Sequence, residues 1–177
     1  MKTRIVEIDE GHRESSLFLA AEIRQDILGH ALGRAEIIFW LQQAREIGIT
    51  QPIIGGNGFN SPNVISSAQA AAEGLIVGAA WFVDSPAPQS QSFVRAYRAA
   101  YNADPDQFAA QAYAAVYIMA TAIKSAGSTQ GTAIRDSLAK VRAIECSLGS
   151  FSFDENRDAV HPSVTLVVRD GRFTIYR

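Results

Sequence analysis

Two short apolar runs, each followed by a helical pattern, constrain the fold of this chain more than any other feature. The first, "QPIIGG", is apolar at Ile53 and Ile54, and the second, "GLIVGAAWF", runs from Gly74 to Phe82. Runs without polar alternation are typical of strands covered on both faces, as in parallel sheets. Strands that alternate with helices predict an α/β fold. We therefore expect a largely parallel sheet flanked by helices.

Apolar spacing predicts helices along most of the remaining chain. In the helix that starts near Ser61, Ser61 is a plausible N-cap and Pro62 fits the first helical position. The residues after 149 predict strand, turn and strand, closed by a β-hairpin at "RDGR", 169–172. The expected helices span 14–28, 34–49, 61–74, 90–105, 106–127 and 129–141, and a further short strand is expected at 4–9.

Composition and charge exclude several classes of protein. The chain has 177 residues, of which 47% are hydrophobic and 19% charged, and its net charge is −2. This balance is typical of a globular protein, and it does not favour binding to nucleic acid or to a membrane surface. The first residues do not have the pattern of a secretory signal, and no apolar run is long enough to cross a bilayer.

The residue types that usually carry enzyme chemistry are sparse. Cys146, the one cysteine, lies among apolar residues and is interpreted as a packing residue. The histidines, His12, His30 and His161, show no metal-ligand spacing, and no GxSxG motif is present. The acidic segment "FDENRD" lacks the glycine and closing glutamate of a calcium loop, so an acidic turn is expected. We predict no cofactor, no metal site and no enzymatic activity.

The loop "GGNGF" is the strongest candidate for a site. A glycine-rich turn between a strand and a helix can present backbone N–H groups to an anion. The same glycines could instead supply the positive φ angles of a tight turn. The pattern leaves these two alternatives open. In either case Asn57 would follow the carboxyl end of a strand, where ligands bind in open α/β sheets.

From about Phe39 to its end, the chain resembles the type I periplasmic solute-binding proteins of ABC transporters, the branched-chain amino-acid-binding family. The resembling motifs follow the family's order: "FWLQQAREIGITQPIIGGNGF", "AAEGLIVGAAWF", "SFVRAYRAAYNADPDQFAAQAYAAVYIMATAIKSAG" and "GSFSFDENRDAVHPSVTLVVRDGRF". The resemblance implies two α/β lobes that close on a small solute, a final hairpin that returns to the second lobe, a periplasmic location and no catalysis.

The resemblance also implies ligand-binding positions. Asn57 stands where the family has an acidic residue that holds the ligand's ammonium group. An amide can form hydrogen bonds but carries no full charge, which favours a carboxylic or aromatic acid over an amino acid. Phe108 matches an aromatic ligand contact of the family, and Phe59 and Trp81 are expected near the same rim. For Trp81, a place in the core is the favoured alternative.

The resemblance divides the chain into an unmatched strand and helix at 1–38 and a solute-binding-protein-like region at 39–177. Because most of the family's first lobe has no match, we expect a truncated member, with an ABC permease as partner only for a full-length form. The helix at 108–123, "FAAQAYAAVYIMATAI", is apolar nearly all round and needs a cover. A homo-oligomer would provide one, and the N-terminal helices folding back are the alternative.

Two other functions remain open at this stage. One is an interaction or assembly protein, built on a remnant of the fold and without a working ligand site. The other is an enzyme that holds a phosphate at the glycine loop, although no nucleophile or acid–base pair accompanies it.

Overall fold

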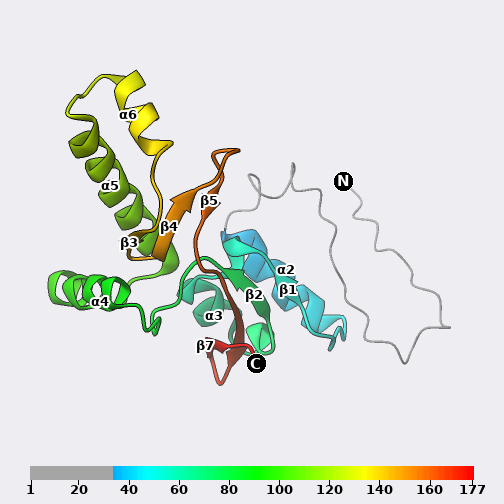
Figure 1. The fold of residues 1–177 in the computed structure, drawn as a ribbon. Coiled ribbons are helices and arrows are strands. Elements are labelled where there is room, and N and C mark those ends of the chain that lie inside the picture. The colour runs from blue at the N-terminus through cyan, green and yellow to red at the C-terminus, as the bar shows by residue number, and fades with distance from the viewer. Residues whose placement is uncertain (1–33) are drawn as a thin grey trace.

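The computed structural model describes residues 34–177, coloured from blue to red in Figure 1. The strand expected at 4–9, the helix expected at 14–28, and His12 and His30 lie outside the described residues. The elements are α2 (Arg34–Glu46), β1 (Ile54–Gly55), η2 (Asn57–Phe59), α3 (Pro62–Ala68), η3 (Gln69–Ala72), β2 (Ile76–Ala79), α4 (Pro88–Tyr101), α5 (Gln107–Ala126), α6 (Gly131–Leu138), β3 (Ile144–Cys146), β4 (Gly149–Phe153), β5 (Ala159–Val160), β6 (Val164–Arg169) and β7 (Arg172–Ile175).

The main sheet has four strands in the order β1-β2-β6-β7. Strands β1 and β2 are parallel, with Ile54 opposite Ile76. Strand β2 is antiparallel to β6, and β6 is antiparallel to β7. The α/β class is therefore confirmed, but the expectation of a largely parallel sheet is wrong for the described strands, because β6 enters beside β2 from the opposite direction.

The final hairpin is confirmed and its turn has a clear local cause. Asp170 and Gly171 have φ angles of 52° and 69°, as a two-residue turn of the type I′ class requires. The Glu73 carboxylate accepts hydrogen bonds from the Asp170 and Gly171 backbone N–H groups at 3.0 and 3.4 Å. This contact joins the turn to the residues just before β2.

The buried residues form two separate clusters. Cluster 1 lies between α2, α3 and the main sheet, and its fully buried members include Leu41, Val64 and Leu75. Cluster 2 joins α4 and α5 to the second sheet, which has the order β3-β4-β5 and is antiparallel. The chain passes between the clusters at 80–87 and returns at 161–163. Figure 1 shows α4, α5 and α6 on one side of the molecule and α2 on the other.

Helix α5 has well-defined ends but little cover. The Asp106 carboxylate accepts from the Ala109 N–H at 2.8 Å and so caps the first turn, and Gly127 ends the helix in the left-handed conformation. The buried positions recur three or four residues apart along one narrow stripe. These are Gln107, Ala110, Ala114, Ile118 and Ala122.

Cys146 is a packing residue, as expected. Its side chain is buried in cluster 2, and its Sγ lies 3.4 Å from the Gly149 carbonyl oxygen, to which the thiol donates. Burial raises the pKa of the thiol above its usual value, which disfavours the reactive thiolate. Among residues 34–177, no cluster of His, Cys, Asp and Glu side chains is placed to hold a metal ion. Over the same residues, no helix combines the length and hydropathy needed to span a membrane.

Candidate functional site

The loop at Asn57 connects a strand to a helix, as the sequence predicts. Strand β1 ends at Gly55, and Asn57 begins the short 3-10 turn η2. Helix α3 then starts at Pro62, with Ser61 as its N-cap. The Ser61 side chain makes no capping hydrogen bond, so Pro62 and the extended backbone of Ser61 define this helix start.

The glycines of this loop have a role that the sequence did not predict. None of Gly55, Gly56 and Gly58 has a positive φ angle, so of the two alternatives left open by the sequence, the one with left-handed turn glycines does not apply. Gly55 is required for a close approach instead. A Cβ atom built on Gly55 would lie only 2.5 Å from Cγ of Phe59, whereas one built on Gly56 would meet nothing within 4 Å. The Phe59 ring therefore lies directly on the Gly55 backbone.

This difference leads to a prediction for two neighbouring glycines. We expect Gly55→Ala to lower the free energy of unfolding by about 1–3 kcal/mol, because the new methyl group forces the Phe59 ring and the loop to move. Gly56→Ala is the matched control and should change stability by less than about 0.5 kcal/mol. Urea denaturation of both variants measures the difference. Equal effects would contradict the assignment of Gly55 as a packing glycine.

A buried glutamine fixes the position of the loop. Gln107, at the start of α5, is 2% exposed. Its Nε2 donates to the Asn57 carbonyl oxygen at 2.7 Å. Its Oε1 accepts from Asn60 Nδ2 at 2.9 Å and from the Ala80 backbone N–H at 3.3 Å. One side chain thus joins the loop, the residue after β2 and the first turn of α5, and we call this the Gln107 junction.

Three of the four expected site residues lie at or beside this junction. Asn57 is exposed and contacts Gln107 through its backbone, while Phe108 follows Gln107 in α5 and is half-buried. Phe59 belongs to the same turn as Asn57 and packs against cluster 1. The structure thus places the loop and the head of α5 together, as the resemblance implied. A ligand-contact role for these residues stays a prediction.

Trp81 has a different environment. It is 5% exposed, its Nε1 donates to Ser90 Oγ at 2.6 Å, and its ring meets Phe93 edge-on with centroids 6.0 Å apart. The indole is therefore held within cluster 2, which is the core role that the sequence favoured. One edge of Trp81 also borders a cavity of about 440 Å³ next to the Gln107 junction.

That cavity combines amide, apolar and charged groups. Asn60 and Gln107 contribute amides, and Trp81, Phe82 and Phe173 contribute aromatic surface. The charged residues around it are Asp84, Arg98, Asp104, Asp106 and Arg172. Arg98 forms an ion pair with Asp104, so these two charges largely neutralise each other. The remaining walls combine polar and apolar groups.

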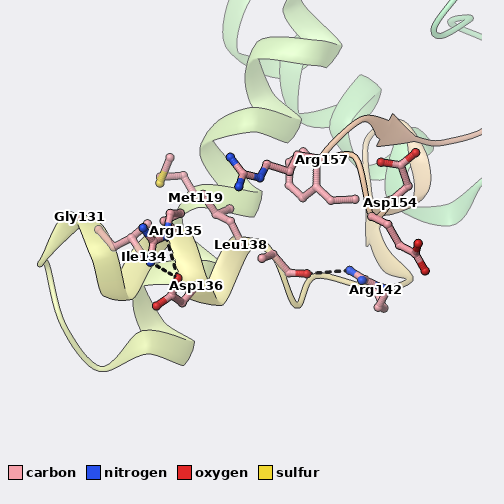
Figure 2. A pocket seen from close by; sticks show the side chains of 12 residues that line it. Met119, Gly131, Ile134, Arg135, Asp136, Leu138, Arg142, Asp154 and Arg157 are labelled. Carbon is pink, nitrogen blue, oxygen red and sulfur yellow. Dashed lines mark hydrogen bonds and ion pairs between the residues drawn. The ribbon is translucent and has the colours of Figure 1, made fainter.

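A larger groove of about 720 Å³ lies elsewhere, between α5, α6 and the turn after β4. Figure 2 shows Arg157 directing its guanidinium toward α5, where Met119 lies. Arg135 pairs with Asp136, and Arg142 donates to the Ala139 carbonyl oxygen at 3.0 Å. None of the four expected site residues lines this groove.

A comparison with known protein families identifies the class. A family model described as a periplasmic binding protein matches residues 19–172. The chain therefore belongs to the periplasmic binding protein family, and the resemblance noted from its motifs is confirmed. The match begins before residue 39, and the boundary expected there stays a prediction.

Solved structures of related proteins agree with this class. The leucine-binding protein LivK of Thermotoga maritima is 29% identical, with a TM-score of 0.77 over 81% of this chain and 41% of its own. The substrate-binding protein LivJ of Streptococcus pneumoniae, in complex with isoleucine, is 32% identical, with a TM-score of 0.71 over 79% of this chain and 40% of its own. This chain thus spans about two fifths of the length of these proteins.

A third relative shows the fold alone. The solute-binding protein of R. palustris in complex with benzoate is 20% identical, with a TM-score of 0.67. It covers 78% of this chain, which corresponds to 39% of its own length.

Gln107 is the residue of this region that sequence reasoning missed. A glutamine directly after the helix-capping Asp106 is usually a solvent-exposed residue of a first turn. Its burial depends on a loop that is 50 positions away along the chain. A weak signal was present, since Gln107 precedes Phe108, the aromatic that the resemblance marked.

Proposed function

We infer that this chain forms one side of the solute site of an ABC-transporter solute-binding protein, and that it binds without catalysis. The Gln107 junction is the observation that carries this proposal, because it fixes the Asn57 loop to the head of α5 with two hydrogen bonds and joins both to Ala80 with a third. A rigidly held loop at the end of a strand is the usual position of a ligand site in an open α/β sheet. The family, and the isoleucine and benzoate bound to LivJ and the R. palustris protein, support a small organic solute.

The chemistry of Asn57 selects the class of solute. The exposed amide can donate to a carboxylate oxygen and accept from a neutral donor, but it cannot neutralise an ammonium group. Phe108 and Phe59 would supply apolar surface, and Trp81 would act only through the wall of the adjoining cavity. We therefore assign a small carboxylic or aromatic acid as the preferred solute and an amino acid as the weaker one.

The biological setting follows from the family. A solute-binding protein of this class works in the periplasm and delivers its solute to an ABC permease, and we propose both for the whole protein to which this fold belongs. The relatives described above are substrate-binding proteins and not enzymes, which supports a non-catalytic role.

A thermal-shift and calorimetry series tests the proposal. We expect benzoate to raise the melting temperature more than leucine or isoleucine, because the amide favours an acid without an ammonium group. Asn57→Ala should abolish this shift. Asn63→Ala is the matched control, since Asn63 is an exposed asparagine on nearby α3. Absence of any shift with benzoate, leucine and isoleucine would contradict solute binding by this chain.

A second variant tests the assigned role of Asn57. We expect Asn57→Asp to shift the preference toward leucine, because a carboxylate paired with an ammonium group gains a charge-assisted hydrogen bond of about 1.5–3 kcal/mol. The gain corresponds to roughly tenfold or more in the calorimetric dissociation constant for leucine. A leucine affinity that does not rise would show that position 57 does not face the ammonium group.

One observation favours a second function, that of an assembly protein. The outer surface of α5 is apolar, and within the described residues Tyr113, Val116, Tyr117 and Met119 are exposed on it. A self-association that persists with no response to any acid or amino acid would support this alternative over solute capture.

A further inference from the structure

The asparagine of the candidate site directly precedes a glycine. Asn57 is followed by Gly58, whereas every other asparagine of the chain precedes a residue that carries a Cβ atom. The side-chain amide of an asparagine can be attacked by the backbone nitrogen of the next residue, which closes a five-membered succinimide ring. A Cβ atom on that next residue crowds the ring closure, and glycine has none. The chemistry therefore favours Asn57 over the other asparagines.

Both reacting groups are exposed and carry no hydrogen bond. Asn57 and Gly58 are exposed on the turn η2. Within residues 34–177, neither the Asn57 side-chain amide nor the Gly58 backbone N–H has a hydrogen-bond partner. Water can therefore reach the amide, and neither group has to give up a hydrogen bond of its own before the ring forms.

The backbone of the turn controls how often the two groups meet. Ring closure requires rotation about the Cα–C bond of Asn57, and this rotation moves the Asn57 carbonyl oxygen out of its place in η2. That oxygen accepts from Gln107 Nε2 at 2.7 Å and from the Asn60 backbone N–H at 3.2 Å. Both hydrogen bonds must break first, so the reaction proceeds from a locally opened loop. The Gln107 junction therefore slows this chemistry.

We propose that Asn57 is a site of spontaneous deamidation. The Gly58 nitrogen gives up its proton and bonds to Cγ of Asn57, and the Cγ–Nδ2 bond breaks. Ammonia leaves with the two hydrogens of the amide and the proton given up by the Gly58 nitrogen. Water then opens the ring. Attack of water at Cγ gives aspartate on the original backbone, whereas attack at the main-chain carbonyl carbon gives isoaspartate.

Conversion to aspartate adds one negative charge at a position that the proposed function assigns to the solute. This consequence rests on that function, in which the amide at position 57 favours an acid over a solute with an ammonium group. A carboxylate reverses the preference, because it attracts an ammonium group and repels an acid. The chain is thus synthesised in an acid-binding form and changes with age into a form that binds amino acids.

Mass spectrometry of the 177-residue chain, kept for several days in mildly alkaline buffer, tests the proposal. We expect Asn57 to convert to its acid, because alkali removes the proton from the attacking nitrogen. Fragment masses assign the change to one residue, so Asn63 serves as an internal control. Asn63 is also exposed, but it precedes the β-branched Val64 and should keep its amide. Retention of the amide at Asn57 overturns the proposal.

Two variants test the mechanism. Gly58→Ala should slow the conversion roughly tenfold or more, because its Cβ crowds the ring closure. The variant fits the structure, since Gly58 has no positive φ angle and the new Cβ would lie 3.7 Å from Ile37 Cδ1, an ordinary contact. Gln107→Ala should accelerate the conversion several-fold by releasing the Asn57 carbonyl. An equal rate in Gly58→Ala overturns the proposal, and an unchanged rate in Gln107→Ala overturns the control by the junction.

Calorimetry on aged protein separates this proposal from the proposed function. We expect the affinity for leucine to rise with the fraction of aspartate at position 57, and to stay unchanged in Gly58→Ala kept for the same time. If the mass changes but no solute binds before or after ageing, the deamidation stands and the solute site is wrong. If the mass does not change, the deamidation is wrong whatever fresh protein binds. Circular dichroism confirms that each variant is folded.

Discussion

Trp81→Ala is expected to lower the free energy of unfolding by about 3–5 kcal/mol, the typical cost of removing a buried large aromatic side chain. The variant removes the edge-on contact with Phe93 and leaves the Ser90 hydroxyl, which is fully buried, without the indole N–H. Urea denaturation followed by circular dichroism measures the effect. For a chain of this size, each kcal/mol corresponds to about 2–4 °C in the melting temperature.

The control for this prediction is an aromatic residue that lies outside both clusters. Phe39 is 59% exposed on α2, so Phe39→Ala should change stability by less than about 0.5 kcal/mol. A second variant, Trp81→Phe, retains a ring but removes the hydrogen bond. Its loss of unfolding free energy should lie between those of Trp81→Ala and Phe39→Ala. A Trp81→Ala protein of normal stability with weakened solute binding would show that Trp81 is a ligand contact and not a core residue.

Gln107→Ala is expected to destabilise the protein by about 2–4 kcal/mol and to loosen the Asn57 loop. The substitution leaves the buried Asn60 amide and the part-buried Asn57 carbonyl and Ala80 N–H without their partner. A buried polar group left unpaired costs about 1–3 kcal/mol, and a part-buried one costs less because water can reach it. Because the loop carries the proposed solute contact, solute affinity should fall as well.

Two further measurements separate the hydrogen bonds of Gln107 from its packing. Gln107→Met keeps the length of the side chain and removes the hydrogen bonds, so it should lose most of the same stability. Gln111→Ala is the control on the same helix, at a half-buried position away from the loop, and it should have a small effect. Amide exchange at Ala80 should accelerate in both Gln107 variants. Unchanged protection at Ala80 would contradict the junction as described.

The described helices, the strands β1 and β2 and the final hairpin could be predicted from local patterns because their causes are local. Helix α5 ends where Gly127 adopts the left-handed conformation, and the final hairpin turns at Asp170 and Gly171. The direction of β6 could not be predicted, since a strand covered on both faces has the same apolar run whether its neighbour is parallel or antiparallel. The three-residue strand β3 is too short to give a periodic signal.

The candidate site was predictable only in part, for a related reason. Asn57 followed from its place after an apolar run, and Phe108 from a motif. The reason for Gly55 was not visible, because the ring that contacts it is fixed by the three-dimensional course of η2. Gln107 was missed because its partners come from two distant segments. Local sequence indicates which residues begin and end elements, whereas the partners of a buried amide are set by the tertiary fold.

The path of the chain between the two clusters has a consequence for the order of folding during synthesis. Cluster 2 draws on one continuous stretch, from Trp81 to Phe153, so it can assemble as soon as that stretch leaves the ribosome. Cluster 1 cannot assemble this early, because β6 lies between β2 and β7 in its sheet and is synthesised some 90 residues after β2. Until β6 arrives, one edge of β2 has no partner strand and is open to pairing with another nascent chain. Strands β6 and β7 therefore complete the main sheet. A stop codon shortly before residue 164 would leave cluster 2 folded and attached to a main sheet that cannot be completed.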